Sequence, residues 1–145
     1  MSKREFDLIV WGATGFTGQL VVEYLVQTYG VDGDLRWAIA GRNRSKLEAV
    51  RRACLATALH DKLPTIVADS DDAGSLAALV ARTRVICTTV GPYAKYGTPL
   101  VAACVEAGTH YCDLTGEVQW MARLIPHYQD AATASGARIV HTCGF

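Results

Sequence analysis

Apolar runs and helical patterns alternate along almost the whole chain. Short continuous apolar runs that end at glycine or polar residues are typical of buried strands, because both faces of such a strand are covered. The run FDLIVW is of this kind, and Gly12 ends it. The pattern predicts six strands, at residues 6–11, 35–40, 65–68, 84–90, 110–114 and 138–142.

Helices are predicted between these strands. Residues 16–29 carry apolar side chains at helical spacing on one face. Ser45 and Glu48 form a capping box, which predicts the start of a second helix that runs to about residue 59. A short third helix is expected over residues 75–82, after acidic capping residues.

Prolines and glycines mark the ends of the last two helices. Thr98 is expected to cap a helix with Pro99 at its first position, and Gly108 to end it. The final helix closes at Gly136. We expect it to be interrupted near Pro126, because proline lacks the backbone N–H that the helix needs.

This alternation predicts the fold class. Strands joined by helices through right-handed crossovers form a doubly wound parallel sheet, so we expect a Rossmann-type, three-layer α/β/α fold of about six strands. The chain length of 145 residues fits one domain, residues 1–145. Phe145 follows the last predicted strand at once, so we also expect the chain to be the front part of a longer protein.

Three glycines, Gly12, Gly15 and Gly18, follow the first strand and open the first helix. This is the position of a dinucleotide-binding fingerprint. The first glycine permits a tight turn, the second lets a pyrophosphate approach the backbone, and the third lets the helix pack close to the sheet. The residues expected at the pyrophosphate are Gly12, Ala13, Thr14, Gly15, Phe16, Thr17 and Gly18. A merely tight strand–helix turn is the alternative.

The end of the second strand predicts which dinucleotide binds. NAD sites usually carry an acidic residue there, but this sequence reads AIAGRNRSK and has none. Arg42, Asn43 and Lys46 stand in its place, and a guanidinium pairs well with a 2′-phosphate. The sequence therefore favours NADP. The alternative, solvated charges at a helix start, suits Arg51 and Arg52 better than Arg42.

Two later strand ends supply further candidates. Asp69 is placed either to meet the adenine edge or to cap the next helix, and these interpretations stay open. The fourth strand ends in TTVGPY, a stiff turn at the sheet edge where the nicotinamide half of a dinucleotide lies. The candidates there are Thr89, Val90, Gly91, Pro92 and Tyr93. An ordinary strand-ending turn would look the same.

Composition excludes several function classes. The formal net charge is zero, which argues against a nucleic-acid partner. Five cysteines form no CxxC pair and show no zinc spacing, so we expect no bound metal. Their odd number and lack of a disulfide framework indicate a reducing compartment. Cys87 and Cys143 are interpreted as core residues. Without an apolar leader or a long apolar segment, we expect a cytoplasmic protein without membrane association.

Candidate catalytic residues are harder to find. No tyrosine is followed by lysine four residues later, so the Tyr-x-x-x-Lys pair of short-chain dehydrogenases is absent. The four histidines show no metal spacing. Six polar residues could face the cofactor edge, but each is better explained as a cap or loop residue: Tyr93, Lys95, Tyr96, Asp113, Thr115 and Glu117. The proton donor is therefore unassigned.

Several separated motifs carry a family resemblance. GATGFTG, AGRNRSKLE, TTVGPYAKYGTPLVAACVEAGTHYCDLTGE and GARIVHTCGF together resemble the N-terminal part of saccharopine dehydrogenase-like oxidoreductases, in particular the branch with trans-acting enoyl reductases. The resemblance implies NADPH-dependent reduction, with an enoyl thioester as one candidate substrate. It also implies a following α+β domain for substrate and homodimer contacts. The cofactor residues implied are Gly12, Gly15, Gly18, Arg42, Asp69, Gly91 and Pro92.

Two function classes remain open at this point. The first is the cofactor-binding half of an NADPH-dependent oxidoreductase, acting on an unsaturated, carbonyl or imine substrate. The second is a non-catalytic NADP-binding redox sensor, which would need no proton donor. An epimerase of the extended short-chain type is disfavoured, because the Tyr-x-x-x-Lys pair is missing.

Overall fold

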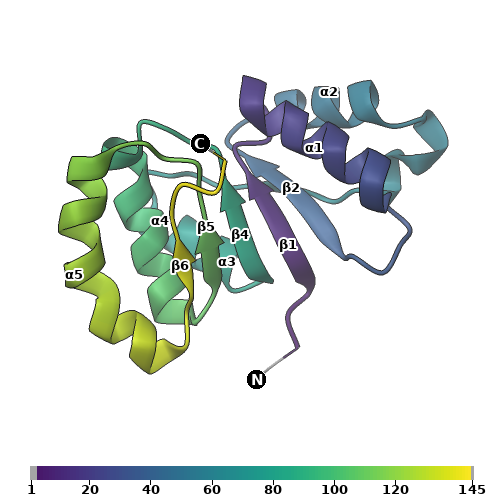
Figure 1. Ribbon diagram of the computed structural model, residues 1–145. Coiled ribbons are helices and arrows are strands. Elements are labelled where there is room, and N and C mark those ends of the chain that lie inside the picture. Colours follow the sequence, from purple (N-terminus) through teal and green to yellow (C-terminus); the bar gives the residue numbers. More distant parts are fainter. Residues whose placement is uncertain (1–2, 145) are drawn as a thin grey trace.

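The computed structural model describes residues 3–144 and contains one six-stranded parallel sheet with the strand order β3-β2-β1-β4-β5-β6 (Figure 1). Phe145, on which the expectation of a longer protein rests, lies outside the described residues. The elements are β1 (Phe6–Trp11), α1 (Phe16–Tyr29), β2 (Trp37–Gly41), α2 (Arg44–Cys54), the 3₁₀ helix η1 (Thr57–Lys62), β3 (Thr65–Val67), α3 (Ala73–Val80), β4 (Thr83–Thr88), α4 (Tyr93–Ala107), β5 (His110–Cys112), α5 (Val118–Ser135) and β6 (Ile139–Val140).

The sheet topology confirms the doubly wound, three-layer prediction. The chain first builds the sheet outward from β1 to β3, then returns to the other side of β1 with β4. The strand order therefore reverses between β1 and β4, where Ile9 pairs with Ile86. In such sheets, ligands bind outside the carboxyl ends of the strands at this reversal.

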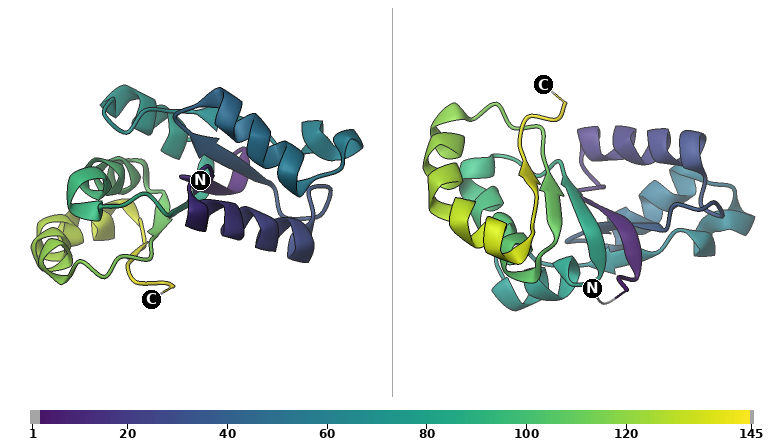
Figure 2. Two further views of the ribbon diagram at one scale, coloured as in Figure 1. Left: turned by 90° about the horizontal axis from the view of Figure 1, so that it is seen from above. Right: turned by 60° about the horizontal axis from the view of Figure 1, so that its bottom comes forward.

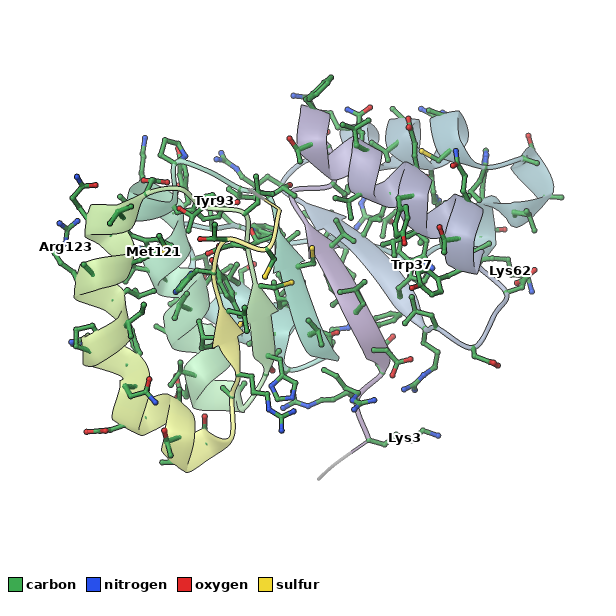
Figure 3. All side chains as sticks on the ribbon, in the orientation of Figure 1. Lys3, Trp37, Lys62, Tyr93, Met121 and Arg123 are labelled. Atoms are coloured by element: carbon green, nitrogen blue, oxygen red, sulfur yellow. The ribbon has the colours of Figure 1, made fainter. Side chains whose placement is uncertain are left out.

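Two separate cores cover the two faces of the sheet. On β2, Trp37 and Ile39 pack with α1 and α2, whereas Ala38 and Ala40 belong to the core under α3, α4 and α5. Figure 2 shows α4 and α5 side by side and apart from α1 and α2. Trp37 points under α1, where its indole N–H donates to the Gly30 carbonyl at 2.9 Å (Figure 3). The central strands β1 and β2 are thus largely buried apolar runs, as predicted, whereas the edge strands β3 and β6 are partly exposed.

The start of α2 differs from the prediction. Asn43 caps this helix by accepting the backbone N–H of Lys46 at 3.0 Å, so Ser45 lies inside the helix. Glu48 does not reach back to form the capping box; it pairs with Arg51 instead. Arg51 also donates to the carbonyls of η1 residue His60 and of Leu63. The helix therefore ends at Cys54 rather than near residue 59, and Arg51 is a structural residue rather than a solvated charge.

Two prolines stand inside helices, contrary to prediction. Helix α4 begins at Tyr93, directly after a cis Gly91–Pro92 peptide, so Pro99 lies in its interior. Helix α5 runs without interruption through Pro126. Each proline removes one hydrogen bond, but α4 and α5 are held by packing against each other and the sheet. The predicted helix ends at Gly108 and Gly136 are confirmed.

The cysteine interpretation is partly wrong. Cys143 lies beyond β6 and is exposed, and Cys87 on β4 is only half-buried. Cys104 on α4 is buried, and burial raises the pKa of its thiol. Within residues 3–144, no helix is long and apolar enough to cross a membrane.

The amino edge of the sheet is held by an arginine near the N-terminus. Arg4 donates to the Ala81 and Ala107 carbonyls at 2.6 Å each, and to the Val80 carbonyl at 3.3 Å. These carbonyls lie at the C-terminal ends of α3 and α4, where a cation is favourable. One side chain thus joins two helices at the end of the sheet opposite the glycine turn.

The close approach of α1 to the turn yields a stability prediction. A Cβ on Gly18 would lie 2.0 Å from the Gly12 carbonyl oxygen. We expect Gly18→Ala to lower the free energy of unfolding by about 3 kcal/mol or more, measured by urea denaturation. Gly15→Ala is the matched control, because its Cβ would approach no closer than 3.6 Å; it should change stability by less than about 1 kcal/mol. Equal stability of the two variants would contradict this packing.

Candidate functional site

The glycine turn links the carboxyl end of β1 to α1. Gly12 has a φ of +87°, a conformation that side chains rarely adopt. Its N–H and that of Ala13 donate to the Ala40 carbonyl at 3.1 and 3.3 Å, and the N–H of Gly15 donates back to the Gly12 carbonyl at 3.2 Å. The turn is therefore fixed to the end of β2. Ala13 is fully buried and contributes to this anchoring rather than to an exposed surface.

The N-terminus of α1 is open to an anion. Side-chain oxygens of Asn43, Asp72 and Glu117 accept N–H groups at the starts of α2, α3 and α4. No side chain caps α1, a property it shares with α5, but only α1 adjoins the glycine turn. Uncapped N–H groups at a helix start bind phosphate groups well. The Phe16 side chain is 83% exposed, so Phe16 can serve a phosphate only through its backbone.

A cleft of about 520 Å³ runs beside the turn, between the ends of β1 and β2. Its charged lining side chains, within the described part of the chain, are both cationic: Arg42 and Lys46. Its lining residues are Trp11, Gly12, Thr14, Gly41, Arg42, Asn43, Lys46, Ser70, Val90 and Tyr96. Such a cleft favours a ligand that carries negative charge.

Arg42 has its guanidinium free for a ligand. It is exposed and makes no side-chain hydrogen bond or ion pair within residues 3–144. By contrast, the Arg51 guanidinium binds Glu48 and the carbonyls of His60 and Leu63. Arg42 also borders a hollow of about 360 Å³ that it shares with Asp69 and Ser75. It thus links the main cleft to the end of β3.

Asp69 does not cap α3. Its carboxylate accepts the N–H of Asp71 at 2.9 Å, and Asp72 is the residue that caps the helix. Of the two interpretations left open for Asp69, the helix cap is therefore wrong, and a position beside the cleft remains. Ser70, which sequence reasoning missed, is nearly buried and lines the cleft directly. Nothing in the run ADSDD distinguishes it from its neighbours.

The segment after β4 closes the other side of the turn. Thr89 donates its hydroxyl to the Gly12 carbonyl at 3.2 Å, and Val90 lines the cleft. A Cβ on Gly12 would lie 2.6 Å from Cγ2 of Val90, so the two segments touch. Gly91 and Pro92 are exposed just beyond and connect this wall to α4.

The Tyr93 side chain turns away from the cleft. Its ring is buried against Trp120, with 5.8 Å between ring centroids, and its hydroxyl donates to the Thr88 carbonyl at 3.3 Å. Burial raises the pKa of Tyr93 to about 12. Tyr93 is therefore not among the residues that line the cleft, whereas Tyr96, one helical turn later, is. Thr17 lies exposed on the first turn of α1.

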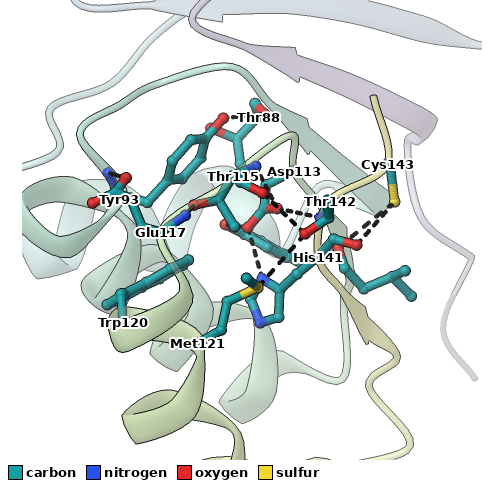
Figure 4. Close-up of polar contacts among 12 residues, drawn as sticks. Thr88, Tyr93, Asp113, Thr115, Glu117, Trp120, Met121, His141, Thr142 and Cys143 are labelled. Atoms are coloured by element: carbon teal, nitrogen blue, oxygen red, sulfur yellow. Dashed lines mark hydrogen bonds and ion pairs between the residues drawn. The ribbon is translucent and has the colours of Figure 1, made fainter. Parts of the chain in front are cut away.

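A second polar cluster lies at the carboxyl ends of β5 and β6, around Asp113 (Figure 4). The side chain of Asp113 is fully buried. It accepts hydrogen bonds from His141 Nδ1 and the Tyr111 hydroxyl at 2.7 Å each, and from the backbone N–H groups of Thr142 and Thr115 at 3.0 and 3.1 Å. Burial alone would raise the pKa of Asp113, but these hydrogen bonds outweigh it and lower the pKa.

Sequence reasoning considered Asp113 for the cofactor edge but did not connect it to His141. The two residues are 28 positions apart, and the pairing of β5 with β6 brings them together. Glu117 is likewise not in the cleft: its carboxylate accepts the N–H groups of Tyr93 and Ala94 at 2.6 and 3.1 Å. It thereby fixes the start of α4.

Fold and site together define a class of protein: a doubly wound dinucleotide-binding domain with a cationic cleft beside its glycine turn. The sequence narrows this class. Residues 8–140 match the model of the saccharopine dehydrogenase NADP-binding domain, and the chain belongs to that family. NADP is therefore its cofactor, as the arginine at the end of β2 predicted.

Curated relatives are similar to the chain over almost its whole length. The chain is 46% identical over 143 residues to a trans-acting enoyl reductase of Mycobacterium leprae, and 45% identical over 144 residues to that of Mycobacterium ulcerans. Each match covers 99% of this chain and 33% of the relative. The chain thus spans about one third of the length of the curated relatives it matches.

Solved structures show the same fold at low sequence identity. Saccharopine dehydrogenase (L-Glu forming) from Saccharomyces cerevisiae superimposes with a TM-score of 0.74 at 17% identity, covering 96% of this chain and 27% of that one. A Citrobacter triphenylmethane reductase in complex with NADP(H) gives a TM-score of 0.67 at 18% identity, covering 94% and 48%.

The buried Asp113 carboxylate generates a pH-dependent stability prediction. Asp113→Asn should lower the free energy of unfolding at pH 7 by about 1–3 kcal/mol, because an amide cannot accept all four hydrogen bonds. Since the folded pKa is lowered, the wild-type advantage is present above the unfolded pKa of about 3.9 and is lost as pH falls through the folded pKa.

Urea denaturation of wild type and variant between pH 7 and pH 3 measures this difference. Asp130→Asn, on the exposed side of α5, is the matched control and should be neutral. A stability gap that stays constant down to pH 3 would show that folding does not lower the pKa of Asp113.

Proposed function

We propose that this chain is the cofactor-binding part of an NADPH-dependent reductase. The observation that carries the proposal is the cationic cleft next to an uncapped helix N-terminus. The N–H groups at the start of α1 would hold the pyrophosphate, and the Gly15 position leaves room for it, since a Cβ there would meet nothing closer than 3.6 Å. Thr14 and Thr17 would add hydroxyl donors.

The adenosine half would lie over the end of β2. Arg42 would pair with the 2′-phosphate, supported by Lys46. The Asn43 side-chain oxygen is already used to cap α2, so Asn43 would contribute its amide nitrogen. Asp69 is proposed to border the adenine side, where Arg42 links the two hollows.

The nicotinamide half would extend toward β4. Thr89, Val90, Gly91 and Pro92 form the wall on that side, and the contact between Thr89 and Gly12 fixes its distance from the turn. When bound, NADPH would supply the hydride, and the residues of this chain would bind and orient it. The Tyr93 side chain would support this wall from beneath rather than touch the cofactor.

The substrate class is proposed from the relatives. The two curated relatives named above are trans-acting enoyl reductases, so an enoyl thioester is the favoured acceptor among unsaturated, carbonyl and imine substrates. We place most substrate and subunit contacts in the part of such proteins that lies outside the matched third. Residues 1–145 would then act as the NADP-binding Rossmann domain.

Arg42 should determine the choice of cofactor. We expect Arg42→Ala to raise the Kd for NADPH by about tenfold to a hundredfold, because a charge-assisted hydrogen bond to the 2′-phosphate is lost. The Kd for NADH should stay unchanged. Calorimetric titration with both nucleotides measures the two constants. Arg44→Ala is the matched control, because Arg44 begins α2 outside the cleft lining. Equal weakening of NADH and NADPH would contradict the assignment of the 2′-phosphate to Arg42.

Oxidation of bound NADPH would separate a reductase from a redox sensor. We expect the full-length gene product to oxidise NADPH when crotonyl-N-acetylcysteamine, a small enoyl thioester, is added, with absorbance at 340 nm as the readout. Gly15→Ala should abolish this by blocking the pyrophosphate site while the protein stays folded. Tight NADPH binding without oxidation by enoyl, carbonyl or imine acceptors would favour the sensor.

A further inference from the structure

A second hollow, the α5–β6 groove, lies on the opposite flank of the domain. It has a volume of about 370 Å³, within the range of small-molecule sites, and is lined mainly by apolar side chains of α5 and β6. Leu124, Tyr128, Ala132, Ile139 and Val140 supply much of this lining, and His141 stands at the strand end. The groove shares no lining residue with the cofactor cleft.

His141 is the buried polar group of this groove. Its side chain is only 8% exposed, and its ring is fixed by edge contacts with Trp120 and Tyr111, at 5.2 and 5.9 Å between ring centroids. Asp113 binds the ring through Nδ1. Figure 4 shows the other ring nitrogen on the side away from Asp113, toward α5.

That second nitrogen, Nε2, makes no hydrogen bond within residues 3–144. The same residues contain no polar side-chain atom that is both fully buried and unpartnered. Nε2 is therefore accessible to solvent, and His141 is one of the residues that line the groove. A nine-tenths buried histidine whose one free nitrogen faces an apolar hollow offers a single, directed hydrogen bond to whatever fills it.

The hydrogen bond of His141 to Asp113 determines which kind of ligand group Nε2 can bind. An ionised carboxylate can only accept, so Nδ1 must donate to it, and in this Nδ1–H tautomer the Nε2 lone pair faces the groove. The buried negative charge behind the ring opposes an anion at Nε2. The one permanently charged lining residue, among those described, is Arg138, which is exposed.

We propose that the α5–β6 groove binds a small neutral molecule with an apolar body and a hydrogen-bond donor, a hydroxyl or an amide N–H, at one end. The donor bonds to Nε2 of His141, and the body packs along Leu124, Tyr128 and Ala132. This inference goes beyond the proposed cofactor site and does not depend on it.

Binding of 1-hexanol tests the proposal, with hexanoate as the anionic analogue of equal chain length. Histidine side-chain ¹⁵N NMR of the ¹⁵N-labelled chain reports the Nε2 resonance of His141 directly. We expect hexanol to shift this resonance saturably, with a Kd of about 1 mM, because a ligand with few non-hydrogen atoms binds weakly. Hexanoate should bind at least about tenfold more weakly.

Two variants on α5 form the matched control. Ala132→Phe fills the groove and leaves the bond between Asp113 and His141 in place, so it should weaken hexanol binding at least about tenfold. Ala134→Phe makes the same change outside the groove lining and should leave binding within about twofold. Both variants should retain NADPH affinity, which also shows that they are folded.

Three outcomes would overturn the proposal: no saturable shift with hexanol, preference for hexanoate, or binding that Ala132→Phe leaves intact. Each can be told apart from a failure of the proposed function, because loss of NADPH binding is measured separately and involves different residues.

Discussion

The close approach of α1 to the end of β1 is the constraint on which the rest of the site depends. The Gly12 carbonyl lies against Gly18, and Val90 lies against Gly12. Helix α1, the turn and the segment after β4 therefore approach so closely that neither glycine position has room for a side chain. This packing aims the first N–H groups of α1 along the carboxyl edge of the sheet. It also sets the Ala40 carbonyl, and with it the end of β2 and Arg42, at a fixed distance from the turn. One packing contact thus positions both the proposed anion-binding N–H groups and the proposed cofactor-selecting arginine.

Much of this arrangement could be read from local patterns. The bounds of β1 and α1 match the prediction because a buried apolar run and glycines at both helix ends leave few alternatives. The start of α2 differs from the prediction because Asn43 and Ser45 are both good caps. Asn43 takes the capping position, and Glu48 pairs with Arg51 in the next turn of the same helix instead of reaching back. The start of α4 was mispredicted because the sequence does not show that Glu117 serves as its N-terminal acceptor.

The remaining site features depend on contacts between distant segments. Tyr93 looked like a cleft residue, but Trp120 on α5 stacks on it and holds it in the core. The bond between Asp113 and His141 requires knowledge that β6 pairs with β5, and no spacing in the chain encodes this. The two polar systems therefore differ in origin. The glycine turn and Arg42 belong to local sequence motifs, whereas the α5–β6 groove is a product of topology.

Arg4 has a consequence for how such a domain can diversify. By joining the ends of α3 and α4 through their carbonyls, it fastens these helices at the amino edge of the sheet, opposite the edge that carries the glycine turn. The Arg4 contacts that join the helices thus lie at the amino edge of the sheet, and the proposed cofactor cleft lies at the carboxyl edge. Loops at the carboxyl edge can therefore change in sequence without loss of the Arg4 contacts. The bound ligand can thus change during evolution while α3 and α4 stay joined.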